Sequence, residues 1–256
     1  RVGADGLLEP ELLAEAIRPD TLLVSVMAAN NEIGVLQPLA ELAPLCHRHG
    51  IALHSDAAQA VGHIPLDAGA AGIDLLSISA HKLYGPKGVG ALVVRPGLPL
   101  APQLHGGGQE GGLRAGTLPV PLIVGMAAAL ELALGDLPQR AVRLAALRDQ
   151  LWLGLEALGG VRRNGAASPR LPHNLNVSVA GVEGSALQRL LRQRLAVSSG
   201  SACSSGEPSH VLRALGLSRQ EAAASIRFGL GRSTSEAEIT TAIETVAAAV
   251  TQLRRG

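Results

Sequence analysis

The sequence predicts an α/β protein with a mostly parallel sheet, followed by a smaller α+β domain. In the first half, near-continuous runs of Val, Leu and Ile alternate with helical patterns, as in parallel sheets covered on both faces. After Gly159 and Gly160 the pattern changes to a shorter unit that mixes strands and helices. We therefore expect a large domain over residues 1–136 and a small domain over residues 137–256.

The elements of the large domain follow from periodicity and turn residues. A helical pattern ends at Gly50, and a long helical pattern should be broken or bent at Pro138, because proline removes a backbone hydrogen bond. The sequence thus predicts strands at 21–28, 51–54, 74–79 and 89–94, and helices at 38–49, 56–61 and 121–158.

In the small domain, short apolar runs are separated by amphipathic segments. These patterns predict strands at 175–179, 197–199 and 225–228, with helices at 184–194, 208–215 and 235–254.

The composition excludes several classes of protein. Hydrophobic residues make up 47% of the 256 residues and charged residues 17%, which indicates a globular chain. The net charge of +1 and the near absence of aromatic residues argue against nucleic-acid binding. The most apolar window, 118–135, contains Pro119, Pro121 and Glu131, which favours a buried helix over a membrane span.

The two cysteines, Cys46 and Cys203, lie in unlike contexts and form no disulfide framework. No secretory signal is visible, so a reducing cytoplasm is the expected location.

The most informative segment is the run 74–90, in which an apolar strand delivers Ser79, His81 and Lys82 to a Pro/Gly turn. A lysine at a strand end becomes a nucleophile when partial desolvation lowers its pKa. The alternative is a surface lysine in a hairpin, and the segment alone favours neither reading.

Asp56 and Gln59 end the preceding strand, and ligands of α/β sheets bind at the carboxyl ends of strands. We therefore expect both residues to lie near Lys82. Pyridoxal phosphate needs a lysine for its Schiff base and a carboxylate for its ring nitrogen. For Asp56 alone, a helix N-cap is the simpler explanation.

A glycine-rich loop at 105–117 precedes a helix, so its N–H groups and the Thr117 hydroxyl could bind phosphate, although its spacing matches no established phosphate motif. Cys203 lies among small residues, as suits a nucleophilic thiol. Arg227 interrupts an apolar strand and would suit a substrate carboxylate or a structural ion pair.

Taken together, six motifs resemble the cysteine desulfurase family, pyridoxal-phosphate enzymes of the class V aminotransferase group. The resemblance covers almost the whole chain, in order, and implies the large domain of a fold-type-I enzyme. Its Ser-Gly-Ser-Ala-Cys segment is similar to the housekeeping and nitrogen-fixation type. The motifs are Asn30-Asn-Glu-Ile-Gly34, His54-Ser-Asp-Ala-Ala-Gln59, Ser79-Ala-His-Lys-Leu-Tyr-Gly-Pro-Lys-Gly88, 106–117, 198–204 and Ser225-Ile-Arg-Phe228.

The resemblance also implies a role for each candidate residue. Lys82 would bind the cofactor covalently and Cys203 would accept sulfur, while the remaining residues would hold the cofactor or the substrate. Asp56 would pair with the ring nitrogen of the cofactor, and Gln59 with its ring hydroxyl oxygen. Ser79 and His81 would bind the phosphate, and Thr117 would bind the phosphate of a neighbouring subunit. Asn31 and Arg227 would hold the substrate carboxylate.

The implied activity converts L-cysteine to L-alanine and leaves a persulfide on Cys203 for iron–sulfur cluster or thio-cofactor assembly. The implied partners are a second copy of the chain and an iron–sulfur scaffold or sulfur-acceptor protein, whose cluster Cys203 would contact. The alternatives are another class V enzyme, such as a selenocysteine lyase or aminotransferase, or a truncated dimerisation or scaffold-binding module without activity.

The chain departs from the family at three places. The family's N-terminal segment, which carries a phosphate-binding turn and a histidine that stacks on the cofactor, has no counterpart before Asn30, so we expect a partial large domain. Gly111 stands where relatives often have arginine, and the loop 203–208 is shorter by about two residues, which limits its reach.

A metal site at Cys46, His47 and His49 is disfavoured, because their spacing does not bring three ligands to one face of a helix.

Overall fold

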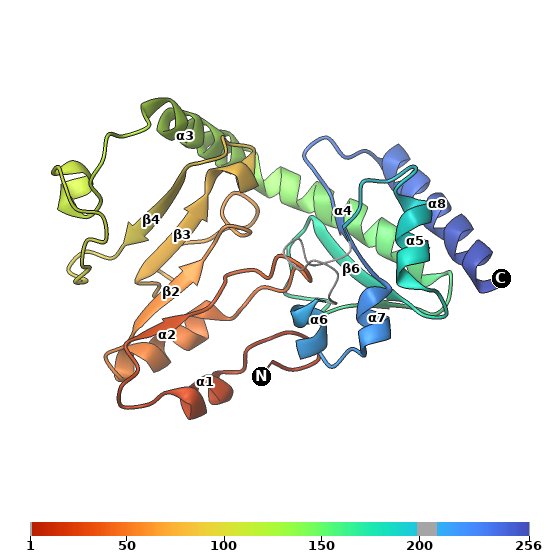
Figure 1. Ribbon diagram of the computed structural model, residues 1–256, viewed down its shortest axis with the longest axis horizontal. Coiled ribbons are helices and arrows are strands. Elements are labelled where there is room, and N and C mark those ends of the chain that lie inside the picture. Colours follow the sequence, from red (N-terminus) through yellow and green to blue (C-terminus); the bar gives the residue numbers. More distant parts are fainter. Residues whose placement is uncertain (1, 199–208, 256) are drawn as a thin grey trace. The chain divides into compact units, whose positions relative to one another are not determined.

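The computed structural model describes residues 2–198 and 209–255, which form two compact units (Figure 1). The N-terminal unit contains Ile17–Ala28 and Leu39–Leu137, and the C-terminal unit contains Arg1–Ala16, Ala29–Pro38 and Pro138–Gly256. The division after Leu137 falls one residue from the expected boundary. Two early segments, however, belong to the C-terminal unit. Which of the two expected domains binds a cofactor stays a prediction.

The N-terminal unit is built on a four-stranded sheet of order β1-β2-β3-β4. The first three strands are parallel and β4 is antiparallel to β3, so the predicted, mostly parallel sheet is confirmed. The strands are β1 (Leu23–Ser25), β2 (Ala52–Asp56), β3 (Leu75–Ser79) and β4 (Gly90–Val94).

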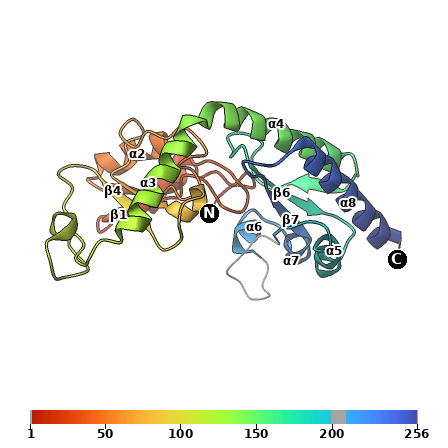
Figure 2. The same ribbon diagram turned by 90° about the horizontal axis from the view of Figure 1, so that it is seen from above.

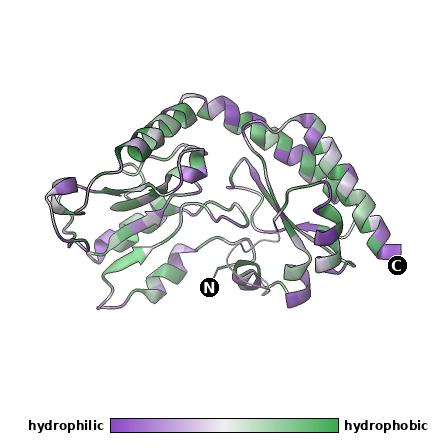
Figure 3. Cartoon of the chain, turned by 45° about the horizontal axis from the view of Figure 1, so that its top comes forward, coloured by the Kyte–Doolittle hydropathy of each residue, from purple (hydrophilic) through white to green (hydrophobic). Residues whose placement is uncertain are grey.

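Two helices accompany this sheet, α2 (Leu39–Arg48) and α3 (Val120–Gly135). Helix α2 packs against β2 and buries Leu42 and Cys46, and it ends before Gly50, whose φ of 69° requires a residue without a side chain. Helix α3 is hydrophobic along most of its length (Figure 3), yet among its described side chains only Met126 and Ala133 are buried.

Three details differ from the prediction. The strand expected at 21–28 is three residues long, and the helix expected at 56–61 is a series of turns. The long helix breaks at Asp136, so that Pro138 is the second residue of the next helix, α4 (Leu137–Glu156). Proline is accepted there because the first turn of a helix lacks intrahelical partners for its N–H groups.

The C-terminal unit has an antiparallel three-stranded sheet of order β5-β6-β7. Its strands are β5 (Val161–Arg163), β6 (Asn174–Val179) and β7 (Ser225–Gly229), and its helices besides α4 are α1 (Pro10–Ala16), α5 (Gly184–Leu191), α6 (His210–Ala214), α7 (Arg219–Ala223) and α8 (Glu236–Arg255). The predicted α+β layout is confirmed, although α1, β5 and α7 were not expected. Of the strand expected at 197–199, only a bridge from Ser198 to Arg227 lies within the described residues.

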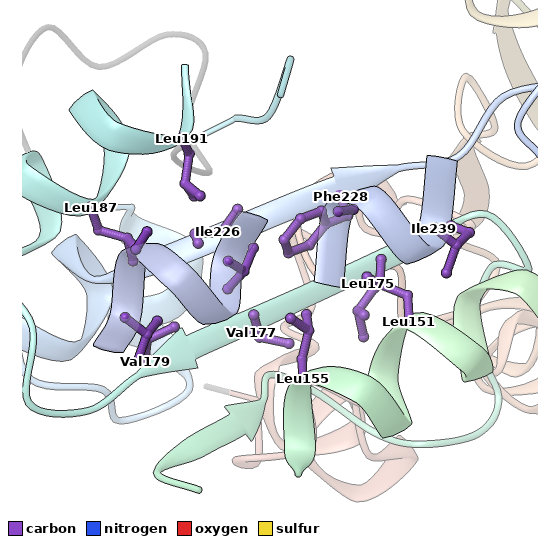
Figure 4. Packing of buried hydrophobic residues seen from close by; sticks show 14 of the residues in the cluster. Leu151, Leu155, Leu175, Val177, Val179, Leu187, Leu191, Ile226, Phe228 and Ile239 are labelled. Atoms are coloured by element: carbon purple, nitrogen blue, oxygen red, sulfur yellow. The ribbon is translucent and has the colours of Figure 1, made fainter. Parts of the chain in front are cut away.

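One hydrophobic core joins this sheet to α4, α5 and α8 (Figure 4). Because side chains alternate along a strand, the apolar residues of β6 and β7 all face this core. Helices α4 and α8 lie side by side (Figure 2), and Gly154 allows close contact with Ile243. The strand residues of the core are Leu175, Val177, Val179, Ile226 and Phe228.

The opposite face of β6 and β7 is polar, and its polar residues are buried except for Arg227, which is half-buried. It carries Asn174, Asn176 and Ser178 on β6, with Ser225 and Arg227 on β7. Asn176 and Arg227 are direct cross-strand neighbours. A buried polar face needs hydrogen-bond partners, so another segment of the chain must supply them.

No single helix in the described ranges is both long and apolar enough to cross a bilayer; only α3 and α4 taken as a broken pair meet the length and composition criteria.

Candidate functional site

Two predicted cofactor residues end neighbouring parallel strands of the N-terminal unit. Asp56 is the last residue of β2 and Ser79 the last residue of β3, and Asp56 lies opposite Ser77 in the register. The exposed Asp56 accepts a hydrogen bond from the backbone N–H of Ala58 at 2.8 Å. Capping of this turn uses one carboxylate oxygen, so acceptor capacity is left for a ligand.

Lys82 follows β3 directly, in a short 3₁₀ helix over Ala80–Leu83. Its backbone carbonyl bonds the His63 ring at 3.0 Å, while its side chain is exposed. The chain reverses at Tyr84, which has a φ of 67°, and continues into β4. The alternative interpretation, a surface lysine in a hairpin, is therefore right about the hairpin. The same turn holds Lys82 at the end of a strand.

The remaining predicted cofactor residues lie on connections within the same unit. Gln59 is half-buried in the turns after β2, and His81 is exposed beside Lys82. Thr117 is exposed in the loop before α3, downstream of Gly111, whose φ of 63° lies in the left-handed region. That exposure suits the role in another subunit that the resemblance assigns to Thr117.

The two predicted substrate residues meet in the C-terminal unit. The Arg227 guanidinium donates from Nη1 to the backbone carbonyl of Asn31 at 2.9 Å, and Asn174 donates to the same carbonyl at 3.4 Å. Arg227 also pairs through its backbone with Ser198. A guanidinium has five N–H donors, so this contact leaves others for a carboxylate. Cys203, the predicted sulfur acceptor, lies outside the described residues.

A third cluster was not anticipated from the sequence. Asp74 is 1% exposed and accepts hydrogen bonds from the Leu53 N–H at 2.7 Å, from His47 at 2.9 Å and from Arg95. Burial alone would raise the pKa of Asp74, but these hydrogen bonds together hold that pKa below its usual value. The cluster lies at the amino end of β3, beside an open groove of about 1070 Å³, at the opposite end of that strand from Ser79.

His47 is thus a hydrogen-bond partner of Asp74, while Cys46 is fully buried and burial raises the pKa of its thiol. Within residues 2–198 and 209–255, no group of three or more His, Cys, Asp or Glu side chains could hold a metal ion. Sequence reasoning also missed the partners of the loop that carries Asn31, although a glutamate inside the motif Asn30-Asn-Glu-Ile-Gly34 was a visible signal.

A lysine, a carboxylate and a hydroxyl at the carboxyl edge of parallel strands are groups that α/β enzymes with a lysine-bound cofactor use. Comparison with known families makes this class specific. The model of the aminotransferase class-V family matches residues 1–241, and the chain belongs to this family.

Among curated proteins, the chain is 52% identical to a cysteine desulfurase IscS of Anaeromyxobacter dehalogenans, over 98% of the chain and 63% of that protein. It is 50% identical to a mitochondrial cysteine desulfurase of Eremothecium gossypii, over 99% of the chain and 52% of the relative. These matches confirm the resemblance drawn from the motifs. The chain spans about 63% of the length of the IscS relatives it matches.

Solved structures agree with this assignment. A NifS-like protein has a TM-score of 0.90 at 38% identity, covering 98% of this chain and 67% of that one. A NifS-like protein from Rickettsia africae has a TM-score of 0.89 at 30% identity, covering 97% and 68%. SspA in complex with cysteine has a TM-score of 0.75 at 38% identity, covering 89% and 64%.

Proposed function

We propose that this chain is part of a cysteine desulfurase, which moves the sulfur of L-cysteine to Cys203 with pyridoxal phosphate bound at Lys82. The observation that carries the proposal is the exposed Lys82 directly after β3, beside a strand that ends in Asp56. The 52% identity to a cysteine desulfurase over nearly the whole chain supports this choice within the family.

The residues at the carboxyl edge of the sheet fit pyridoxal phosphate, on which class V aminotransferases depend. Lys82 offers an amine at a strand end, Asp56 a carboxylate for the ring nitrogen, and Ser79 a hydroxyl for the phosphate. Gln59 and His81 lie on the adjacent turns, and Thr117 would serve the phosphate of a neighbouring subunit. When bound, the cofactor withdraws electrons from the substrate carbon next to its amine.

Asn31 and Arg227 would hold the carboxylate of L-cysteine. The two residues are joined through the Asn31 carbonyl, so an amide and a guanidinium are available in one place. Arginine matches a carboxylate with two parallel hydrogen bonds, which fixes the orientation of the substrate as well as its charge. The complex of SspA with cysteine describes that protein, and it supports this substrate here by similarity.

The chemical step that we assign to Cys203 balances without a further reactant. The Cys203 thiolate attacks the sulfur of the substrate, an S–S bond forms and the C–S bond breaks. The electron pair of the C–S bond stays with the substrate carbon, which takes up a proton, so the products are L-alanine and a persulfide on Cys203. An iron–sulfur scaffold or another sulfur-acceptor protein of the cytoplasm would then receive the sulfur.

Cofactor binding is the first test. The purified chain, mixed with pyridoxal phosphate and dialysed, should turn yellow, whereas Lys82→Ala should lose the colour on dialysis. Lys87→Ala is the matched control, because Lys87 is exposed in the same turn and should leave the colour unchanged. A wild-type chain that stays colourless contradicts the proposal.

Sulfur transfer is the second test. With L-cysteine and dithiothreitol, the loaded chain should form alanine and sulfide in equal amounts, and Cys203→Ser should lose sulfide formation while keeping the colour. Cys46→Ser changes a buried cysteine that carries no proposed role and serves as the control. Formation of a keto acid instead of alanine would identify an aminotransferase, and activity with selenocysteine alone a selenocysteine lyase.

A further inference from the structure

In the loop that carries Asn31, three consecutive peptides are hydrogen-bonded through both their N–H and their carbonyl groups. On the N–H side, the Asn30 side-chain oxygen accepts from Glu32 N at 2.9 Å and from Ile33 N at 3.0 Å. The Asn30 carbonyl accepts from Gly34 N at 2.9 Å. Three consecutive peptide N–H groups are thus bonded to one residue.

The carbonyl groups of the same three peptides are bonded by the buried polar face of β6 and β7 and by Arg170. The carbonyl of Asn31 accepts from Arg227, that of Glu32 from Asn176 at 3.1 Å, and that of Ile33 from Arg170 at 2.7 Å. Burial and neighbouring arginines lower the pKa of Arg170 to about 10, so it still carries its charge at neutral pH. Each of these three peptide planes is therefore held through both its N–H group and its carbonyl group.

The Glu32 side chain anchors this loop to a distant part of the same unit. Glu32 is 2% exposed, and its carboxylate accepts a hydrogen bond from the Ser209 hydroxyl at 2.5 Å. Ser209, itself 3% exposed, also accepts from the backbone N–H of Leu212 and so caps α6. A hydroxyl has one donor and two acceptor lone pairs, so both contacts are compatible.

Apolar packing around the anchor strengthens it. Ile33 and Val35 share a small core with Leu212, Leu215 and Leu217, which lie just after Ser209. A hydrogen bond to a buried carboxylate is stronger than a neutral one, and losing either partner leaves the other buried without compensation. Glu32 and this packing together hold the loop on the α6 segment.

We propose that Glu32 is a positioning residue: its hydrogen bond with Ser209 keeps the Asn31 peptide in the orientation that aligns Asn31 and Arg227 for a substrate carboxylate. This inference rests on the proposed function, which assigns these two residues to the carboxylate of L-cysteine. Glu32 acts through the peptide that it shares with Asn31 and needs no contact with the substrate.

The test compares Glu32→Ala, Glu32→Gln and Ser209→Ala in the cofactor-loaded chain. Glu32→Ala and Ser209→Ala should each raise KM for L-cysteine about ten-fold and leave kcat within about two-fold. The reason is that only the groups that bind the substrate carboxylate lose their alignment. Glu32→Gln keeps the size and one acceptor oxygen, so KM should return to within about three-fold of wild type. The control is Ser218→Ala, which removes the cap of α7 and should leave KM unchanged.

Hydrogen exchange gives a readout without catalysis. Amides of residues 32–34 should exchange about ten-fold faster in Glu32→Ala than in wild type or Ser218→Ala. An unchanged KM in Glu32→Ala overturns the inference, even if exchange increases, because the bond is then structural only. If wild type forms no alanine, the proposed function fails instead, and unchanged exchange in Glu32→Ala then overturns the positioning role separately.

Discussion

At the scale of single residues, Asp74 shows how one buried carboxylate connects several elements. It receives hydrogen bonds from the Leu53 N–H in β2, from His47 at the end of α2 and from Arg95 just after β4. Its backbone carbonyl also accepts from Arg95 N at 2.8 Å. A buried charge is tolerated because these donors replace water, so an uncharged side chain with fewer acceptor oxygens leaves some of the donors unpaired.

We predict that Asp74→Asn lowers the free energy of unfolding by about 2–3 kcal/mol at pH 7. The pKa of Asp74 is lower in the folded chain than in the unfolded chain, so its contribution is present above the unfolded pKa of about 3.9 and is lost as the pH falls through the folded pKa. The difference between variant and wild type should therefore shrink below about pH 4. Urea unfolding, followed by circular dichroism at pH 7 and below about pH 4, measures this difference in the free energy of unfolding.

Asp67→Asn is the matched control for this experiment, because Asp67 is an exposed carboxylate that accepts one backbone N–H from Ala70. It should have a much smaller effect at pH 7. An Asp74→Asn difference that stays the same at both pH values would contradict a charge-based role.

At the scale of elements, α5 depends on a close approach of two backbones. Glu183 caps its start by accepting from Ser185 N and Ala186 N. A hydrogen bond from the Ser185 hydroxyl, together with these two backbone hydrogen bonds, lowers the pKa of the Glu183 carboxyl. Gly184 follows, and a Cβ at that position would lie 2.1 Å from the Ala223 carbonyl oxygen. Glycine is required there because only a residue without a side chain lets α5 lie this close to Ala223. This close approach brings Leu187 of α5 into the core.

We predict that Gly184→Ala destabilises the chain by about 2 kcal/mol, although alanine is the better helix former by about 1 kcal/mol. The reason is that α5 must move away from the end of α7. Gly135→Ala, at the end of α3, meets no atom within 4 Å and should be neutral or stabilising. Thermal unfolding of both variants decides this, and equal stability of Gly184→Ala and wild type would contradict the steric argument.

At the scale of the whole molecule, the N-terminal unit exposes many apolar side chains. Leu22 is 85% exposed just before β1, Val93 is 47% exposed on β4, and Val124 is 60% exposed on α3. A contiguous apolar surface marks an interaction site, and we predict that these side chains belong to one. Together with the role that the family resemblance gives to Thr117, it leads us to expect a homodimer.

We predict that light scattering after size exclusion gives a mass of twice 26.1 kDa at micromolar concentration. Val124→Glu should weaken this association because it places a charge on the exposed side of α3. Val142→Glu is the control, since Val142 is 74% exposed on α4 of the C-terminal unit. A wild-type chain that stays monomeric over the whole concentration range would refute the prediction.

The sequence alone determined much of this protein, because several of its signals are local. Alternating and helical periodicity, with glycine and proline turns, placed the four strands of the N-terminal sheet and strands β6 and β7 of the C-terminal sheet. It also put Lys82 and Asp56 at strand ends. Motif resemblance identified the family. Short elements such as β5 and α7 were missed because three to five residues carry little periodicity, and β5 contains two arginines.

Only the tertiary structure decided which distant residues share a site. Glu32 and Ser209 are 177 positions apart, and nothing near either one indicates the other. Residues 29–38 lie early in the chain but belong to the C-terminal unit, because the polar face of β6 and β7 needs the carbonyl groups of that loop. Local patterns specify how a segment folds, whereas the satisfaction of buried polar groups is settled only when the segments pack together.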